Sequence, residues 1–290
     1  MFLRRQGDGI RRLGPADRDR ARGVCLRDPV AAVLAAVQVE TLGLRSAYGS
    51  ELLGIREGED DVAALCWVGA NVIPVGLTAR QVPTVADHLR RQGRRCSSIV
   101  GDSAQVLALW DRLRPLWGEA RDVRPRQPSM VIDGPPTVDA DRAVRPAELH
   151  ELDLVLPASV AMFTEEVGYD PTRTGGAYAA RVGELLRAGR TYIRTEPLEP
   201  DWADGPHRVV FKADVGALAL GVAQIQGVWV APDRRGRGLA TAGMAAVVHQ
   251  VRRTFAPLVS LYVNDYNLSA IAAYERIGMR TVGEYATVLF

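Results

Sequence analysis

The stretch GVWVAPDRRGRGLA, residues 227–240, decides the fold, because an apolar strand enters a turn of glycine and arginine that leads directly into a helix. The strand expected over 222–230 is rich in β-branched and aromatic residues and stops before Pro232, which cannot extend a ladder. After the turn, apolar residues return at the steps of three and four that are typical of an amphipathic helix: Met244, Val247, Val248, Val251 and Phe255. The stretch therefore predicts a strand, a tight turn and a helix in succession.

The turn itself has the composition of an anion site. Gly236 and Gly238 remove two Cβ atoms where the backbone must turn and approach a ligand closely. The first turn of the following helix offers free N–H groups and the positive end of the helix dipole. Arg234, Arg235 and Arg237 add positive charge, so a diphosphate is the expected ligand. The alternative is a strand-turn-helix unit whose glycines serve packing and whose arginines serve solubility.

A second strand-turn-helix unit follows. Residues 257–263 are expected to form a strand that ends in a run of polar turn formers. A short helix is expected over 268–277, closed by Gly278, which suits a left-handed C-cap. Asn267 and Tyr274 are seven residues apart, so they lie on the same face of that helix.

These two units resemble the GNAT superfamily of acyl-CoA-dependent N-acetyltransferases. The acetyl-CoA signature of that family, Arg or Gln, two residues, Gly, one residue, Gly or Ala, is matched by Arg235, Gly238 and Ala240. Its downstream signature is matched at Asn267, Ala270, Tyr274 and Gly278, with Met279 in place of the usual aromatic residue. The departure at Met279 concerns core packing more than chemistry.

A longer resemblance extends over nearly the whole chain, to a two-domain bacterial group in which a half of unassigned function precedes a GNAT domain. The segments that carry it are WVGAN at 67–71, SSIVG at 97–101, AMFTEEVG at 161–168 and ATVLF at 286–290. The expected fold is α/β, of the α+β type with a mixed sheet, with two GNAT-like domains in tandem. A run rich in proline and glycine predicts a linker around 133–140. The expected domains are residues 1–135, degenerate, and residues 136–290, which hold the acetyl-CoA site.

The pattern of the N-terminal part is also α/β. It predicts helices over 29–40, 82–92 and 104–117 and strands over 52–56, 62–68 and 98–100. No turn of glycine and arginine stands at the matching place, so this part is expected to be catalytically silent. The C-terminal part predicts a strand over 142–145, a helical stretch over 148–167 interrupted at Pro157, a helix over 178–186, strands over 191–194 and 209–213, and a loop over 196–206.

Composition restricts the class of protein. The chain has 290 residues, 47% hydrophobic and 24% charged, as is usual for a soluble globular protein. We expect a cytoplasmic protein without a membrane segment, because no apolar run is long enough and the start has no signal peptide. The 3 cysteines are widely spaced and the 4 histidines are scattered, so no metal site is expected. The net charge of +2, without basic runs interleaved with aromatic residues, gives no sign of nucleic-acid binding.

The GNAT resemblance implies a set of cofactor-binding residues. The main-chain amides of the turn would hold the pyrophosphate, and β-strand-like pairing from Val228, Trp229 and Val230 would hold the pantetheine. The residues of the turn are Arg235, Gly236, Arg237, Gly238, Leu239 and Ala240. Asn267 would contact the cofactor or, alternatively, serve as the N-cap of its own helix. Tyr274 would contact the cofactor and act as the general acid that protonates the leaving thiolate, or else it would be a core aromatic residue.

The residues offer several candidates for the general base. Many GNAT relatives carry a carboxylate on the strand before the pyrophosphate turn, whereas this chain has Gln224 and Gln226 there, and amides cannot accept a proton. Glu165 and Glu166 precede Gly168 at a predicted helix end, where the dipole disfavours a negative charge. Another candidate is the terminal carboxylate of Phe290. An amine that arrives neutral, with water as a relay, is a further alternative.

These residues predict an N-acetyltransferase that transfers an acetyl group from acetyl-CoA directly to an amine, in a ternary complex. The acceptor would be a small molecule or a protein amino group, and its binding loops are too variable to identify it. The alternative is a catalytically weak acyl-CoA-binding or sensing module that signals through the N-terminal domain. The missing carboxylate at Gln224 and Gln226 favours that alternative.

Overall fold

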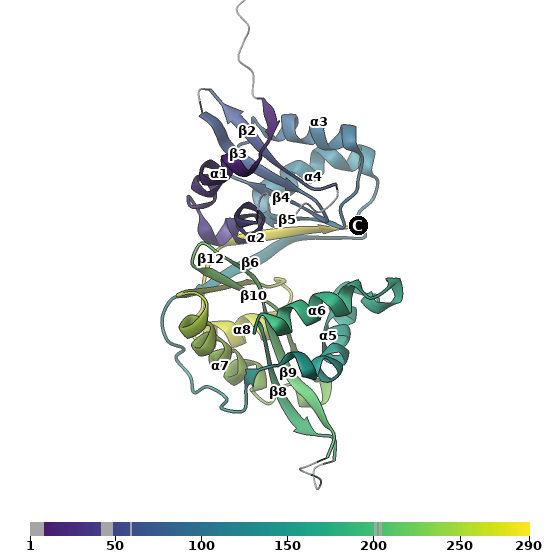
Figure 1. Cartoon of the computed structure of the whole chain (residues 1–290), viewed down its shortest axis with the longest axis vertical. Coiled ribbons are helices and arrows are strands. Elements are labelled where there is room, and N and C mark those ends of the chain that lie inside the picture. Colours follow the sequence, from purple (N-terminus) through teal and green to yellow (C-terminus); the bar gives the residue numbers. More distant parts are fainter. Residues whose placement is uncertain (1–8, 42–48, 59, 200–201, 203–204) are drawn as a thin grey trace, which may run out of the picture. The chain divides into compact units, whose positions relative to one another are not determined.

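The computed structural model describes residues 9–41, 49–58, 60–199, 202 and 205–290 (Figure 1). Its backbone divides into two compact units. The N-terminal unit contains Met1–Ser129, Tyr262–Tyr266 and Thr281–Phe290, and the C-terminal unit contains Met130–Leu261 and Asn267–Arg280. The final strand of the chain therefore belongs to the N-terminal unit, across the division into 1–135 and 136–290.

The strands of the N-terminal unit lie in the order β1, β2, β3, β4, β5, β12, β6. Their bounds are β1 Ile10–Arg12, β2 Glu51–Glu57, β3 Asp60–Val68, β4 Asn71–Val75, β5 Ser98–Asp102, β12 Arg280–Leu289 and β6 Asp122–Ile132. β4 and β5 pair in parallel, with Asn71 opposite Ser98, whereas β5 and β12 are antiparallel. The helices are η1 Pro15–Asp17, α1 Arg18–Cys25, α2 Pro29–Glu40, α3 Val82–Gln92 and α4 Ser103–Trp117.

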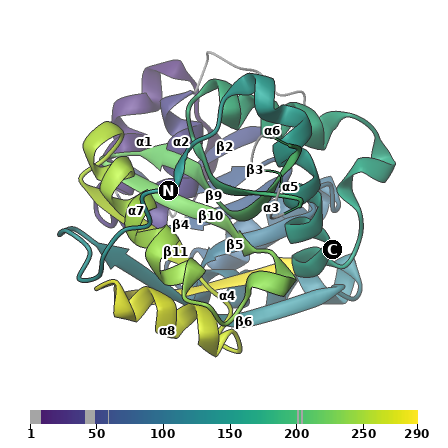
Figure 2. The same ribbon diagram turned by 90° about the horizontal axis from the view of Figure 1, so that it is seen from below.

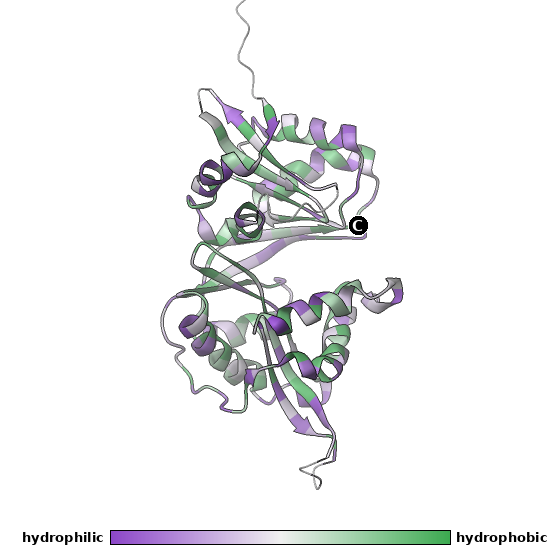
Figure 3. Ribbon diagram, viewed as in Figure 1, coloured by the Kyte–Doolittle hydropathy of each residue, from purple (hydrophilic) through white to green (hydrophobic). Residues whose placement is uncertain are grey.

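Hydrophobic side chains from the sheet, α3 and α4 form one core in this unit. α3 shows the cause in its sequence: Val82, Val85, Ala86 and Leu89 recur at helical spacing and are buried, while polar residues occupy the other face (Figure 3). α4 begins at Asp102, whose carboxylate accepts a hydrogen bond of 3.1 Å from the Gln105 amide and so caps the helix.

The strands of the C-terminal unit lie in the order β11, β10, β9, β8, β7. Their bounds are β11 Leu258–Tyr262, β10 Val222–Val230, β9 His207–Ala219, β8 Thr191–Pro197 and β7 Arg145–Pro146. The helices of this unit are η2 Leu149–Glu151, α5 Leu152–Val167, η3 Pro171–Thr174, α6 Ala177–Arg187, η4 Pro232–Arg234, α7 Leu239–Thr254 and α8 Leu268–Arg276. β10 is parallel to β11 and antiparallel to β9.

Helices cover both faces of this second sheet. α7 lies on one side of β9 and β10 and α5 on the other, in both views (Figures 1 and 2). The contacts agree, because a Cβ on Gly243 of α7 would meet the Phe211 ring of β9, and a Cβ on Gly227 of β10 would meet Met162 of α5. Both units thus repeat one motif, in which a strand, a helix and a parallel strand follow each other. The predicted mixed α/β fold in two parts is confirmed.

One predicted break is wrong. α5 runs without interruption from Leu152 to Val167, although Pro157 lies within it. The ring of Pro157 removes only the hydrogen bond to the carbonyl of Asp153, and both residues are exposed, so water can satisfy that carbonyl. Burial of Val155, Ala158 and Ser159 holds the helix together on its other face.

Candidate functional site

The two central strands of the C-terminal unit separate halfway along β10. Their parallel register joins Val222, Ala223 and Gln224 to Leu258, Val259 and Ser260, and among the described residues it includes no later residue of β10. On the opposite edge the pairing with β9 is irregular between Gln226 and Trp229. Gly227, with φ +60°, lies in this irregularity, here called the Gly227 bulge. One edge of β10 beyond Gln224 is therefore left without a neighbouring strand.

The main chain of Val230 points toward that open edge. Ala231 donates its N–H to the Val210 carbonyl on β9 at 2.9 Å, and backbone groups alternate along an antiparallel strand, so Val230 faces away from β9. Val228, two residues earlier, shares this edge by the same alternation. The Val230 carbonyl accepts a hydrogen bond of 3.0 Å from Arg235 Nε. Trp229 instead directs its side chain to α5, where Nε1 donates to Glu165 Oε1 at 3.2 Å.

The turn after β10 presents a row of unused N–H groups. Gly236 and Gly238 have φ of +73° and +78°, values that suit only glycine without strain. A Cβ at either position would have no atom within 4 Å, so the turn faces open space. The first main-chain bond into α7 comes from Ala242, which donates to the Gly238 carbonyl at 3.1 Å. Within the described part of the chain, the N–H groups of residues 236–241 have no acceptor; they are here called the amide cluster.

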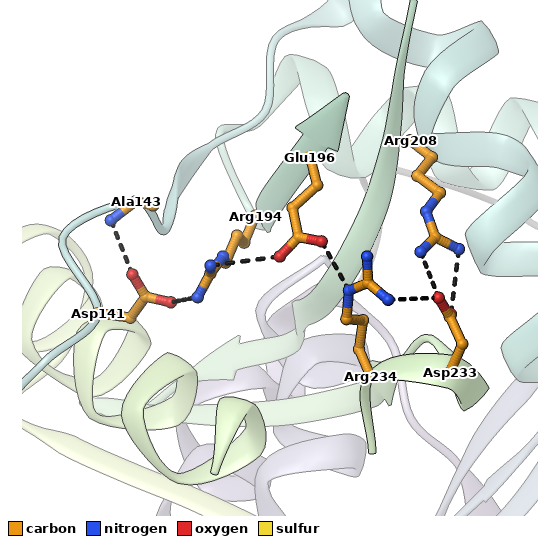
Figure 4. Close-up of polar contacts among 7 residues, drawn as sticks. All are labelled: Asp141, Ala143, Arg194, Glu196, Arg208, Asp233 and Arg234. Atoms are coloured by element: carbon orange, nitrogen blue, oxygen red, sulfur yellow. Dashed lines mark hydrogen bonds and ion pairs between the residues drawn. The ribbon is translucent and has the colours of Figure 1, made fainter. Parts of the chain in front are cut away.

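A network of ion pairs holds the segment that leads into the amide cluster (Figure 4). Asp233 binds Arg208 at 2.5 Å and Arg234 at 2.7 Å, and Arg234 also binds Glu196 at 2.8 Å. Arg194 continues the chain, with Glu196 at 3.3 Å and Asp141 at 2.7 Å. Arg234 is thus committed to fixing the turn.

The other two arginines of the turn differ from each other. Arg235 Nη2 pairs with Glu165 Oε2 at 2.6 Å, with both side chains about half exposed. Arg237 is exposed, and no partner for it is found in the residues that the structure describes. Arg235 thus ties the turn to the end of α5, whereas Arg237 keeps an exposed charge beside the amide cluster.

The equivalent turn of the N-terminal unit, between β4 and α3, is closed by the protein itself. The Leu77 amide donates to Gln105 Oε1 at 2.8 Å, and the Thr78 amide donates to Gln81 Oε1 at 2.9 Å. The amides of Gln81 and Val82 both donate to the Thr78 carbonyl, and Pro83 has no N–H. These donors are already used and are therefore not available to a diphosphate.

Tyr274 and Asn267 lie on α8 as predicted, but in different environments. Tyr274 is buried, and burial together with the charge of Glu166 raises the pKa of its phenol well above the usual value. Asn267 is exposed, and its Oδ1 accepts from the Ala270 amide at 3.2 Å, so it serves as the N-cap of α8.

Phe290, the other residue proposed for catalysis, lies in the N-terminal unit. Its ring contacts Trp110 and Trp117 edge to face, with centroids 5.5 and 5.7 Å away, and lies under the Arg94 guanidinium. Its amide donates to the Ser97 carbonyl at 3.0 Å. Phe290 is therefore part of the core of that unit, and we do not include it in the site of the C-terminal unit.

Two polar groups near the bulge were missed by the sequence analysis. Lys212 and Asp214 on β9 form a buried ion pair on the α5 side of Gly227. Gln224, whose Nε2 lacks a partner among the described residues, lies at the point where β10 and β11 separate. A signal for the pair existed, because Lys212 is the only lysine of the chain and interrupts an apolar strand.

Two family models match the chain. Residues 176–279 match the acetyltransferase (GNAT) family, and residues 50–155 match a domain of unknown function, DUF4081. The first match contains β10, the amide cluster, α7 and the whole of α8, so the open site lies within the region that matches the GNAT family. The second covers the N-terminal unit from β2 to β6 and continues into the start of α5. The search of curated protein sequences found no significant match.

Several solved structures share this fold over nearly their whole length, among them two described as GNAT or GCN5-related acetyltransferases. A GNAT acetyltransferase from Colwellia psychrerythraea is 11% identical, with 97% of this chain and 99% of that chain covered and a TM-score of 0.54. A GCN5-related N-acetyltransferase from Sphaerobacter thermophilus is 19% identical, with 96% and 94% covered and a TM-score of 0.56. A Drosophila protein is 12% identical, with 98% and 99% covered and a TM-score of 0.63. At these identities the likeness concerns the fold alone.

Two searches of the described residues complete the account. Among their helices, none combines the length and apolarity needed to cross a bilayer. No cluster of three or more histidine, cysteine, aspartate or glutamate side chains lies close enough together there to hold a metal ion.

Proposed function

Because the C-terminal half of the chain carries a domain of the GNAT acetyltransferase family, we propose that the protein is an N-acetyltransferase that transfers an acetyl group from acetyl-CoA to an amine in a ternary complex. The observation that carries the proposal is the amide cluster, residues 236–241, which faces open space with its hydrogen bonds unmade. Unused donors at a helix N-terminus suit a diphosphate. The closed turn of the N-terminal unit gives the contrast within one chain.

The residues present fit coenzyme A along its length. The amides of Gly236, Gly238 and the start of α7 would hold the diphosphate, with Arg237 adding its charge. The open edge of β10 at Val228 and Val230 would pair with the amides of the pantetheine, as a strand would. Arg235 leaves the Val230 carbonyl when that pairing forms. The bound cofactor supplies the acyl group as a reactive thioester.

Tyr274 would protonate the thiolate that leaves. Its phenol is buried, and its raised pKa keeps the proton on the oxygen at neutral pH. The leaving thiolate, whose thiol has an ordinary pKa of about 8.5, is less basic than this phenolate. Tyr274 would therefore donate its proton in concert with cleavage of the C–S bond, while charge develops on sulfur, and would regain a proton afterwards. Asn267 would act on this step indirectly, by fixing the start of α8.

The proton acceptor is harder to assign among the residues proposed from sequence. Gln224 and Gln226 are amides, and Glu165 is already bound by Arg235 and Trp229. The charge of Glu166 contributes to the raised pKa of Tyr274, so Glu166 lies near the proposed acid. This nearness does not make Glu166 the base.

A second function rests on those same two glutamines. Without a carboxylate on β10, the protein would bind acyl-CoA tightly and report its presence through the N-terminal domain. The two functions differ in product formation and agree in cofactor binding.

The test combines a binding and a product measurement. Isothermal calorimetry with acetyl-CoA measures whether the cofactor binds, and mass spectrometry follows transfer of isotope-labelled acetyl groups to pools of small amines and peptides. Binding with labelled product supports the acetyltransferase, and binding without product supports the sensor. Absence of binding would remove both functions.

A further inference from the structure

A buried ion pair lies on β9 at the Gly227 bulge. Lys212 is 1% and Asp214 8% exposed, and Lys212 Nζ donates a hydrogen bond to Asp214 Oδ2. The hydroxyl of Thr191, on β8, donates to the other carboxylate oxygen at 2.8 Å. Both oxygens of Asp214 are thus held in a fixed orientation.

The pair lies directly against the backbone of the bulge. In the register of β9 and β10, Asp214 is opposite Gln226 and Lys212 is opposite Trp229, so the two charges flank the irregularity. A Cβ on Gly227 would lie 3.2 Å from Asp214 Oδ2 and 3.4 Å from Lys212 Nζ. Because position 227 is glycine, no side chain separates the pair from the main chain of β10.

Stability alone gives a weak reason for this pair. Removing two charges from water costs about as much as, or more than, their attraction returns, and apolar residues of the same size are often equally stable. Lys212 is also the single lysine in a chain whose other basic residues are all arginine. β-Bulges occur often next to active sites, so a buried charged pair at such a bulge has a functional explanation where a stability argument gives none.

We propose, on the premise of the acetyltransferase function, that Asp214 is the group that accepts the proton of the acceptor amine, and that Lys212 and Thr191 position it. Val230 and Gly227 are three residues apart, about 10 Å along an extended strand. A pantetheine that pairs with Val230 and Val228 therefore brings its thioester end to the bulge. The acceptor, approaching from the side of α5, then meets Asp214.

The step balances as follows. The ammonium of the acceptor transfers one proton to the Asp214 carboxylate, and its nitrogen forms a C–N bond to the acyl carbon. The C–S bond breaks, and the thiolate takes the proton of Tyr274. The nitrogen still carries two hydrogens after the attack, so it loses a second proton, and that proton restores the phenol of Tyr274 through water. Asp214 releases its own proton to water, so each turnover yields an amide, a thiol and one proton.

The surroundings of Asp214 contain few other titratable groups. Besides Lys212, the groups that face it are Thr191 from β8, Gln226 from β10 and Tyr178 from α6. Met162 of α5 contacts the bulge with its methyl group. Burial, and then the charge of Asp214, raise the pKa of Tyr178 to about 12, so this phenol keeps its proton at neutral pH.

The first test uses the single lysine. Protein labelled with ¹³C and ¹⁵N in lysine alone gives one side-chain NMR signal, that of Lys212. We expect saturating acetyl-CoA to shift it, and 3′-phosphoadenosine 5′-diphosphate, which lacks the pantetheine and thioester, to leave it in place. The proposed placement of the thioester end beside Lys212 is overturned if the signal does not move although calorimetry shows that acetyl-CoA is bound. It is also overturned if both ligands shift the signal equally. If neither ligand binds, the proposed function itself fails.

The second test is the pH profile of kcat/KM with the amine found by the labelling screen. Asp214→Asn should lower kcat by about 10²–10⁴-fold and remove the low-pH limb. Lys212→Met leaves the carboxylate without its counter-charge and should move that limb to higher pH, and Lys212→Arg should restore it. Glu151→Gln, which breaks an ion pair with Arg145 elsewhere in the unit, should leave the limb in place. The inference is refuted if Asp214→Asn keeps the wild-type kcat and an unchanged low-pH limb. If that variant does not fold, the NMR test still applies, because it uses the wild-type protein.

Discussion

The contacts of Arg235 lead to a prediction about cofactor affinity. In the structure its guanidinium binds both the Val230 carbonyl and Glu165, and so covers the acceptor that the pantetheine would use. A pantetheine that pairs with this carbonyl would displace the guanidinium and so compete with the ion pair between Arg235 and Glu165. Glu165→Gln removes that competition before the cofactor arrives, so this variant should bind acetyl-CoA more tightly than the wild type.

The magnitude follows from exposure. The two side chains are 49% and 45% exposed, and an ion pair this exposed contributes about 0.2–1 kcal/mol. Because 1.4 kcal/mol corresponds to a tenfold change in Kd, the Kd of Glu165→Gln should fall by about 1.4- to 5-fold. The difference should shrink at high salt, since exposed charges are screened.

Calorimetry of acetyl-CoA binding at two salt concentrations is the assay. Glu184→Gln is the matched control, because it breaks an equally exposed pair with Arg181, 3.6 Å apart, and changes the net charge by the same amount. The reasoning fails if both variants change affinity equally, which would reflect net charge, or if Glu165→Gln binds more weakly. Turnover in the same variant also tests Glu165 as a base, since a catalytic carboxylate would not tolerate the amide.

Three further predictions concern other parts of the chain. Gly238→Val, at φ +78°, should lose acetyl-CoA binding, because it adds about 1–2 kcal/mol of backbone strain and a side chain at the amide cluster. Gly134→Ala should still bind acetyl-CoA, and circular dichroism checks that both variants fold. Tyr274→Phe should lower kcat by about 10²–10⁴-fold with an unchanged calorimetric Kd, and unchanged kcat would exclude the general acid. Burial raises the pKa of Cys25 and Cys96 to about 11. Neither thiol should therefore react with a disulfide reagent at pH 8 until the protein is unfolded, and rapid reaction in the native state would contradict their burial.

Strong local patterns allowed much of the C-terminal unit to be predicted. The strand at 222–230 is confirmed with its bounds, and α7 begins directly after the glycine turn. Apolar periodicity and glycine placement are local properties, and they sufficed here. The same local reasoning explains why Asn267 was recognised as an N-cap.

Long-range pairing could not be predicted in this way. β6 contains Pro125 and Pro128, which are unusual inside a central strand, and yet Gln127 between them is buried and bonded to Asn264 and Thr287. The pair of Lys212 and Asp214 was missed for a similar reason, because only the fold shows that their face of β9 meets a bulge. The position of β12 in the sheet likewise depends on partners that are far away in sequence.

The place of β12 has a consequence for how the protein is made. β5 pairs with β12 through Tyr285 to Leu289, and the ribosome adds these residues only after it has synthesised the whole C-terminal unit. Until then β5 presents an unpaired edge during synthesis, which invites association with other nascent chains. A gene fragment that stops after α8 would leave that edge permanently bare, so co-expressing a separate peptide that spans β12 should rescue its solubility.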